Sequence, residues 1–160
     1  MLGTVNRELI YATEEDEDTE WDNKMEEKIR HLEMIQGIIN RIAKNSFLLK
    51  GWSVILVSAL FALSAKDSNI CFILLAYFPA LAFWILDGYF LQQERLFRKL
   101  YDMVRAMNNE DIDFSMDTSI VEKEVESWLC VCFSKTILIF HGIIIFAICV
   151  VAYTTLNVGT

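Results

Sequence analysis

The sequence predicts an all-α integral membrane protein with three transmembrane helices, cytoplasmic helical extensions and assembly as a homo-oligomeric bundle. Of its 160 residues, 54% are hydrophobic, and the mean hydropathy is +0.35. Three long apolar runs occupy residues 47–64, 70–91 and 128–156. Each is close to or above the ~20 residues that a helix needs to cross a ~30 Å hydrocarbon core. Soluble domains of this size seldom combine such runs with positive hydropathy. The composition therefore favours a membrane protein over a soluble one.

Residues 1–22 show little apolar periodicity and contain a block of like charge from Glu14 to Asp18. Like charges repel one another, so this segment is predicted to be an acidic flexible tail. Two roles are open for it. It is either a simple solvated tail or an internal competitor for a basic site, because its carboxylates mimic a nucleic-acid backbone.

Residues 23–46 are predicted to form a cytoplasmic amphipathic helix. Leu32, Ile35, Ile39 and Ile42 follow one another at spacings of three and four, which is the pattern of an a/d seam. No proline interrupts the run, so we expect this helix and the first span to form one continuous rod. The seam needs a partner, which is the helix after the second span, the same helix of another subunit, or both.

Residues 47–91 are predicted to form a transmembrane hairpin, because the short polar link at 66–69 makes its two spans antiparallel. Residues 92–107 continue the second span as a cytoplasmic helical extension with apolar side chains at helical spacing. Residues 108–126 form an acidic connector, and residues 127–157 form the third transmembrane helix.

The distribution of lysine and arginine predicts the orientation. These residues gather in the N-terminal helix and at 95–105, whereas the C-terminal tail carries no charged side chain. Because basic residues favour the cytoplasmic side, we expect a multi-pass protein with a cytoplasmic N-terminus and an external C-terminus.

Lys50 and Asp87 are the most informative charges within the apolar runs. Lys50 lies 16 positions from Lys66, and Asp87 lies 18 positions from Asn69. At ~1.5 Å per residue, the two stand at nearly the same depth. Charges in hydrocarbon are costly and tend to pair, so we predict an intramembrane ion pair between Lys50 and Asp87. We interpret this pair mainly as a structural contact that fixes the packing of the two helices. A role in gating would be consistent with the same contact.

Polar side chains elsewhere in the spans are candidates for lining a pore. In an oligomer they would form rings around an axis, and a ring of lysine would favour anions. Two of them also have an alternative to pore lining: Lys135 would reach the inner interface, and His141 would hydrogen-bond to a neighbouring helix. The candidates are Ser53, Ser58, Ser134, Lys135 and His141.

The inner helices carry a basic surface with two competing interpretations. Basic residues beside a membrane attract anionic lipid headgroups. Several subunits around an axis would instead multiply this surface into a site for an anionic ligand such as a nucleotide or a single-stranded oligonucleotide. The residues concerned are Lys24, Lys28, Arg30, Arg41, Lys44, Arg95, Arg98, Lys99 and Arg105.

The sequence contains no signature of an enzyme, such as a Walker loop, GxGxxG, HExxH or a nucleophile elbow. No metal site is predicted, because Cys130 and Cys132 lack a second ligand pair. We interpret the four cysteines as free thiols that act as small apolar residues. We therefore expect no enzyme activity, no catalytic residue and no cofactor.

Three stretches of the sequence carry a family resemblance: HLEMIQGIINRIAKNSFLLKGW, ALFALSAKDSN and WILDGYFLQQERLFRKLYD, all within residues 31–105. They resemble small bacterial membrane effectors of the SLATT type, including the Hailong type, which belong to anti-phage defence operons. The third predicted span departs from the usual two-span plan of this group.

The resemblance implies an oligomeric channel in the bacterial inner membrane, with a tetramer favoured. Its ligand would be a nucleotide signal or single-stranded DNA oligomer made by a nucleotidyltransferase, and its opening would depolarise and arrest the cell. The alternative is a non-conducting membrane scaffold or sensor that docks a soluble partner through its inner helices.

Overall fold

The computed structural model describes the backbone of residues 2–67 and 70–158, and the side chains of residues 20–66 and 70–157. All regular secondary structure in this part of the chain is helical, as predicted. The elements in order are α1 (Leu2–Asp67), α2 (Ile70–Leu75), α3 (Tyr77–Ala106), the 3₁₀ helix η1 (Ser119–Glu124), α4 (Trp128–Cys132) and α5 (Lys135–Val158).

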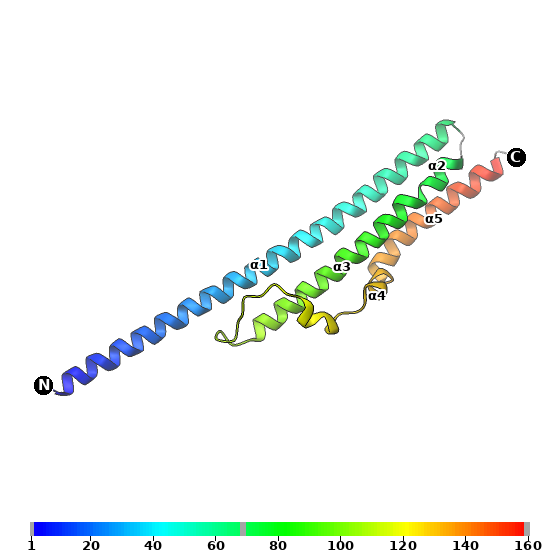
Figure 1. The fold of residues 1–160 in the computed structure, drawn as a ribbon. Helices are drawn as coiled ribbons and strands as arrows, with labels where there is room; N and C mark the ends of the chain where they lie inside the picture. The colour runs from blue at the N-terminus through cyan, green and yellow to red at the C-terminus, as the bar shows by residue number, and fades with distance from the viewer. Residues whose placement is uncertain (1, 68–69, 159–160) are drawn as a thin grey trace.

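Three stretches of helix are long and apolar enough to cross a membrane: Glu20–Lys66, Ile70–Ala106 and Lys135–Asn157. This agrees with the three predicted spans. Helices α2 and α3 run back along α1, and α5 lies beside them (Figure 1). The N-terminal part of α1 extends beyond the other helices, and the last turn of α5 lies near the opposite end of α1.

Helix α1 runs without interruption from Leu2 to Asp67, so the predicted continuous rod is present. The prediction of a separate tail over residues 1–22 is wrong for the backbone of residues 2–22, which belongs to the helix. The physical reason is composition, because glutamate, alanine, leucine and arginine are good helix formers and no proline occurs there. Further along, Lys24 also pairs with Glu20 one turn earlier, at 2.8 Å.

The second span is divided at Ala76 into α2 and α3. Pro79 explains the division. A proline has no N–H to donate and its ring clashes with the carbonyl four residues earlier, here that of Leu75. The amide of Ala76 is shared between the carbonyls of Phe72 and Ile73, at 3.2 and 3.1 Å, which tightens the chain locally before the helix resumes.

We call the part of the bundle formed by residues 20–46 and 92–126 the charged half. Its core joins Ile35 and Ile39 of α1 to Leu96, Leu100 and Val104 of α3. The predicted seam therefore has the helix after the second span as its partner. Val121 of η1 completes this core.

The connector covers one side of the charged half. Phe114 places the edge of its ring against the buried His31, with the ring centroids 5.6 Å apart. Its φ of 56° is unusual for an aromatic residue. The Nζ of Lys28 donates to the carbonyl of Met107 at 2.6 Å, so the start of the connector is also held to α1.

We call the remainder, residues 47–91 and 127–157, the apolar half. A second core joins Val57 of α1 to Ile73, Ala76 and Ala80 of the second span and to Ile144 and Ile148 of α5. Large apolar side chains such as Phe47, Phe78 and Phe146 are instead exposed. This surface suits contact with lipid acyl chains.

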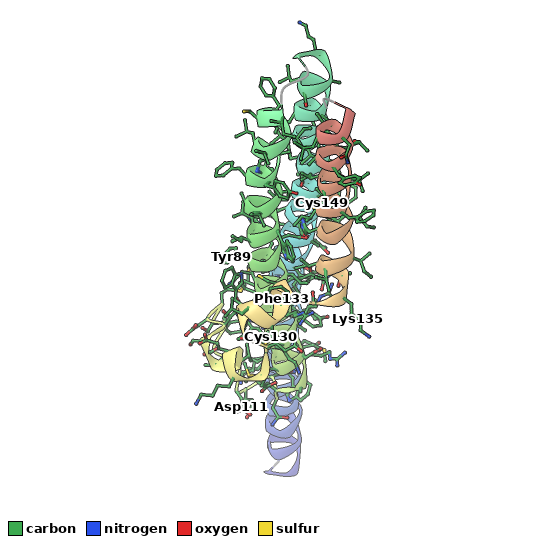
Figure 2. All side chains as sticks on the ribbon, turned by 90° about the vertical axis from the view of Figure 1, so that its right-hand side faces the viewer. Tyr89, Asp111, Cys130, Phe133, Lys135 and Cys149 are labelled. Carbon is green, nitrogen blue, oxygen red and sulfur yellow. The ribbon has the colours of Figure 1, made fainter. Side chains whose placement is uncertain are left out.

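The third apolar run is not one helix, as the boundaries 127–157 predicted, but two. Helix α4 ends at Cys132, and α5 begins at Lys135. The amides of Phe133 and Ser134 donate hydrogen bonds to the carbonyls of residues 130 and 131, at 3.2 and 3.0 Å, which closes the last turn of α4. The first hydrogen bond of α5 runs from the amide of Leu138 to the carbonyl of Ser134 at 2.9 Å. Serine is a favoured residue at such a helix start. Figure 2 shows Cys130 on α4, Phe133 directly after that helix and Lys135 at the start of α5.

Candidate functional site

A polar cluster, which we call the polar centre, joins the three long helices at the end of the apolar half that adjoins the charged half. It consists of Ser46, Lys50, Asp87 and His141. The Nζ of Lys50 lies 2.6 Å from Asp87 Oδ1, and the hydroxyl of Ser46 donates to the same oxygen at 2.5 Å. The Nε2 of His141 lies 3.2 Å from Asp87 Oδ2. Asp87 therefore bonds to α1 through one carboxylate oxygen and to α5 through the other.

The placement of these residues follows from helical periodicity. Ser46, Lys50 and Ser53 are separated by four and three residues, so they lie on one side of α1. That side continues the face that buries Ile35 and Ile39 in the charged half. One face of α1 thus buries Ile35 and Ile39 in the charged half, then Ser46, Lys50 and Ser53 at the polar centre, and then Val57 in the second core.

The polar centre is shielded from its surroundings. The side chain of Asp87 is 1% exposed and that of His141 is 1% exposed, whereas that of Lys50 is 27% exposed. The Nζ of Lys50 also donates to Ser46 at 2.8 Å. A buried charge is tolerated only with partners, and Asp87 has three.

Trp84 connects the polar centre to α4. Its ring stacks on His141 with centroids 6.0 Å apart and an angle of 5° between the rings. Its Nε1 donates to the carbonyl of Cys132 at 2.9 Å. Beside it, a Cβ added to Gly88 would lie 2.3 Å from Cys132 Sγ, so this close approach of α3 and α4 requires glycine. A movement of α4 would therefore shift Trp84, and with it the ring contact to His141, which is a partner of Asp87.

The structure contains the Lys50–Asp87 contact that the depth count predicts. It also answers the question left open for His141, which bonds to a neighbouring helix of its own chain. The sequence analysis did not predict that Asp87 contacts His141 as well as Lys50. A depth count could have indicated it, because His141 lies about as far from the C-terminal end of the third apolar run as Asp87 lies from the link at 66–69.

The five pore candidates do not share one surface. Ser53 and His141 are buried inside the single chain, and the Oγ of Ser134 is also covered. Ser58 and Lys135 are exposed. Only these two can line a space outside their own bundle in this arrangement.

Most of the predicted basic surface is neutralised within the chain. Lys24, Arg30, Arg95, Arg98, Lys99 and Arg105 each lie within 4.0 Å of a carboxylate. Lys28 is bound to the Met107 carbonyl. Arg41 and Lys44 are exposed, and neither side chain forms an ion pair or hydrogen bond with a described residue. They are the best candidates of the nine for an external anion.

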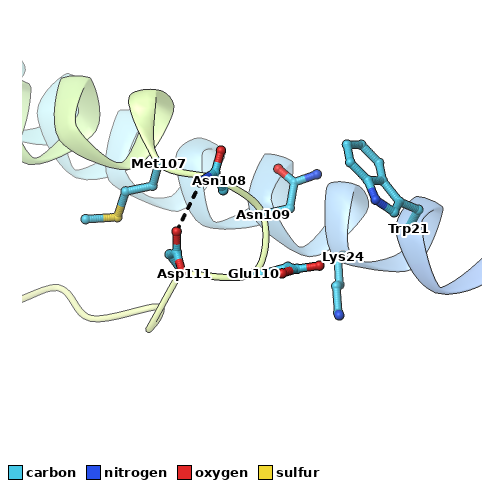
Figure 3. Close-up of a pocket in the computed structure, with 7 residues that line it drawn as sticks. All are labelled: Trp21, Lys24, Met107, Asn108, Asn109, Glu110 and Asp111. Carbon is cyan, nitrogen blue, oxygen red and sulfur yellow. Dashed lines mark hydrogen bonds between the residues drawn. The ribbon is translucent and has the colours of Figure 1, made fainter.

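A pocket lies where the connector leaves α3 (Figure 3). It is lined by Trp21 and Lys24 of α1 and by residues 107–111. Asn108 Nδ2 donates to Asp111 Oδ2 at 3.3 Å across part of its wall. Its mixture of an aromatic ring, amides and charges of both signs does not single out one class of ligand.

Among the described residues, no three His, Cys, Asp or Glu side chains gather as a metal site would require. Cys130, Cys132 and Cys149 do not form disulfides. The polar centre thus offers a carboxylate, an ammonium group and an imidazole, without a set of metal ligands.

Comparison of the chain with protein-family models, with curated proteins and with solved structures finds no match.

Proposed function

We propose that this chain is one subunit of a homo-oligomeric membrane channel, a bacterial anti-phage effector of the inner membrane that is gated by an anionic nucleotide or oligonucleotide. The observation that carries the proposal is the polar centre. Buried ionisable groups are costly within a membrane, and they typically mark ion pathways and their gates. Here they join three helices, each apolar enough to span a bilayer.

One copy of the chain does not enclose a conduit in the described bundle. The space between α1, α3 and α5 is filled by the polar centre and by the second core around Val57, Ile73 and Ile148. Protein interiors of this kind are close-packed. A pore must therefore form between copies, and the family resemblance favours four of them.

The outward face of α1 is suited to contact with another copy. Gly37, Lys44, Gly51 and Ser58 repeat every seven residues on this face, and all are exposed. Glycine within a helix is unfavourable by ~1 kcal/mol relative to alanine. Apart from the glycine's own helical turns, no described atom lies within 4 Å of a Cβ built at Gly37 or Gly51, so no contact among the described residues accounts for them. Close approach by a second α1 helix would do so.

The same face carries the two unpaired cations, Arg41 and Lys44. If α1 helices surround an axis, these side chains form a ring of positive charge at one mouth of the pore. Such a ring would hold the phosphates of a nucleotide or oligonucleotide. The ligand gates the channel only if it binds the open and closed states with different affinity.

The experiment is ion flux from liposomes that contain the purified chain. We expect flux that a thiol-reactive cation blocks in a Ser58→Cys variant, in a background where the native cysteines are replaced. Ser53→Cys is the matched control, because Ser53 lies on the same helix but is buried. Tight liposomes under all conditions would contradict the channel. Equal block of both variants would contradict this pore face.

Ligand binding is tested by charge reversal in two pairs. Arg41→Glu with Lys44→Glu should abolish binding of a single-stranded DNA oligomer to the solubilised oligomer and alter toxicity in cells. Arg98→Glu with Lys99→Glu should weaken binding less, because both residues already have acidic partners. Unchanged binding in both variants would remove the anion-gated mechanism.

A non-conducting scaffold is the second candidate, and one observation favours it. Trp21, Met25 and Ile29 are exposed at four-residue intervals on α1, where Trp21 is 59% exposed. This apolar stripe lies outside the predicted membrane span, so a soluble partner protein could cover it. Stoichiometric co-purification of such a protein, together with absence of flux, would establish this alternative.

A further inference from the structure

A groove on the charged half is built from oppositely charged walls. One wall consists of Arg95, Arg98, Lys99 and Asp102 of α3, and the other of residues 124–126 of the connector. Arg95 Nη1 lies 2.5 Å from Glu126 Oε2, and Lys99 Nζ lies 3.7 Å from Glu124 Oε2. These are the contacts that close the groove.

These two contacts differ from the other ion pairs of the charged half. The pairs of Lys24, Arg30 and Arg98 join residues one turn apart on the same helix. Arg95 and Lys99 instead reach across to a separate segment, 31 residues away in the case of Arg95 and Glu126. The carboxylates therefore occupy a cationic site that α3 presents independently of them.

We propose that this groove is a phosphate-binding site that the connector's own carboxylates occupy, and that a phosphate group binds there by displacing Glu124 and Glu126. A guanidinium group binds carboxylate and phosphate through the same planar pair of N–H donors, so one can replace the other on Arg95. Lys99 supplies a second positive charge one turn away. Exposed ion pairs contribute little to stability, so their displacement does not unfold the protein.

The displaced segment is short and well defined. Val121 is 1% exposed within the core of the charged half, which anchors the connector on one side of Glu124. Cys132, packed on Gly88, anchors it on the other side. Val125, between the two glutamates, also packs against this core, so the side chains of Glu124 and Glu126 are the groups that need to move. Helix α4 begins at Trp128, two residues after Glu126, so the groove lies beside the start of α4.

This site deepens the proposed function, and only its effect on conductance rests on that proposal. The carbonyl of Cys132 accepts a hydrogen bond from Trp84, whose ring stacks on His141, a partner of Asp87. From the groove the chain continues through α4 to Cys132, and from Cys132 these contacts lead to the polar centre. We expect phosphate binding to change the α4–α3 contact first.

Two sources of phosphate can reach the groove. Arg95 lies eight residues beyond Asp87 on α3, which is ~12 Å at 1.5 Å per residue. This places the groove about where the headgroups of a membrane around the apolar half would lie. A lipid phosphate and a soluble phosphate compound are both within reach, and the shared chemistry is the phosphate group.

The test uses the whole chain in phosphatidylcholine nanodiscs, titrated with tripolyphosphate in a calorimeter. The Glu124→Gln/Glu126→Gln variant should bind about five- to tenfold more tightly than the native chain, because the competing charges are gone. Arg95→Gln/Lys99→Gln should lose this binding. Glu110→Gln/Glu122→Gln is the control with the same change of charge, since neither residue forms an ion pair in the described part of the chain. It should stay within about twofold of the native affinity.

Repeating the titration in phosphatidylglycerol nanodiscs separates the two sources. If the lipid phosphate occupies the site, tripolyphosphate should bind the Glu124→Gln/Glu126→Gln variant more weakly there than in phosphatidylcholine. Equal affinity in both lipids would assign the site to a soluble phosphate. Equal affinity of the Glu124→Gln/Glu126→Gln and Glu110→Gln/Glu122→Gln variants, or binding that survives Arg95→Gln/Lys99→Gln, would overturn the proposal.

These measurements do not depend on conductance. If the affinities change as expected while liposomes stay tight, the channel proposal fails and the phosphate site stands. If liposomes conduct but the affinities do not change, the phosphate site fails and the channel stands.

Discussion

The charged half and the apolar half share two helices, α1 and α3, and each has an apolar core, but among the described residues only the apolar half also buries a carboxylate with its partners. In the charged half, Ile35, Leu100 and Val104 lie inside and the ion pairs lie on the surface. In the apolar half, Asp87 and His141 lie inside and large apolar side chains lie outside. The comparison shows that one helix face can have an apolar core at one end and a charged cluster at the other.

The difference is the one expected if the charged half lies in water and the apolar half lies between lipid chains. In water, removal of apolar area drives association, so the charged half needs only its apolar core. Between lipid chains that driving force is absent, and helices associate through polar contacts and close packing. The Asp87 contacts and the close approach at Gly88 are of these two kinds.

The comparison is tested most strongly by Asp87→Ala. This change leaves Lys50 and His141 without their acceptor, which should lower the free energy of unfolding in micelles by about 4 kcal/mol. Asp102→Ala is the control, because Asp102 is exposed and lies 3.7 Å from Arg105. Denaturant titration followed by circular dichroism measures both. Equal stability of the two variants would mean that the polar centre does not hold the apolar half together.

Leu100→Ala tests the opposite claim for the charged half. Leu100 is buried in the core with Ile35 and Ile39, so its truncation should cost about 3 kcal/mol through lost burial and a cavity. Leu129→Ala is the control on an exposed leucine. Hydrogen exchange should show that the loss is confined to residues 20–46 and 92–126. Loss of protection around Asp87 instead would show that the halves unfold as one unit.

Gly88→Ala examines the close packing of the apolar half. The added Cβ would meet Cys132 Sγ at 2.3 Å, so we expect a loss of about 1–3 kcal/mol. Gly142→Ala is the control, since nothing lies within 4 Å of its Cβ. The double variant Gly88→Ala/Cys132→Ala should recover part of the loss in the same unfolding assay. Absence of any recovery would show that the Cys132 contact is not the cause.

Asp117→Asn should have the smallest effect. The amide and hydroxyl of Ser119 donate to the Asp117 carboxylate, and these hydrogen bonds hold its pKa below the ordinary value. A lowered pKa means that the stabilisation is present above the unfolded pKa and is lost as pH falls through the folded pKa. The native chain should therefore be slightly more stable than the variant at pH 7 and equal to it at low pH. A difference that persists below pH 3 would assign the effect to another contact.

Part of this arrangement could be read directly from residue spacing. The a/d spacing of Ile35 and Ile39 predicts the core of the charged half, and the depth of Lys50 and Asp87 predicts their contact. Both follow from regular helix geometry alone. The joining of His141 to Asp87 was not foreseen, because it depends on where α5 docks between the other two helices.

The basic surface, by contrast, is a feature that residue spacing alone could not predict correctly. Nine lysines and arginines on the inner helices suggested one large cationic site, but partner choice is a tertiary property. The connector returns to α3 and places Glu124 and Glu126 against Lys99 and Arg95, whereas Arg41 and Lys44 form no ion pair with any side chain that the structure describes. Only the folded connector distinguishes these two groups of cations.

The sequence by itself determined the helical class, the three apolar segments and the polar residues that interrupt them, because these depend on local composition and on the 3.6-residue period of a helix. The tertiary structure decided the break between α4 and α5, the docking of η1 on the charged half and the sharing of Asp87 between Lys50 and His141. These features depend on contacts between residues far apart in the chain, whose geometry no local pattern contains.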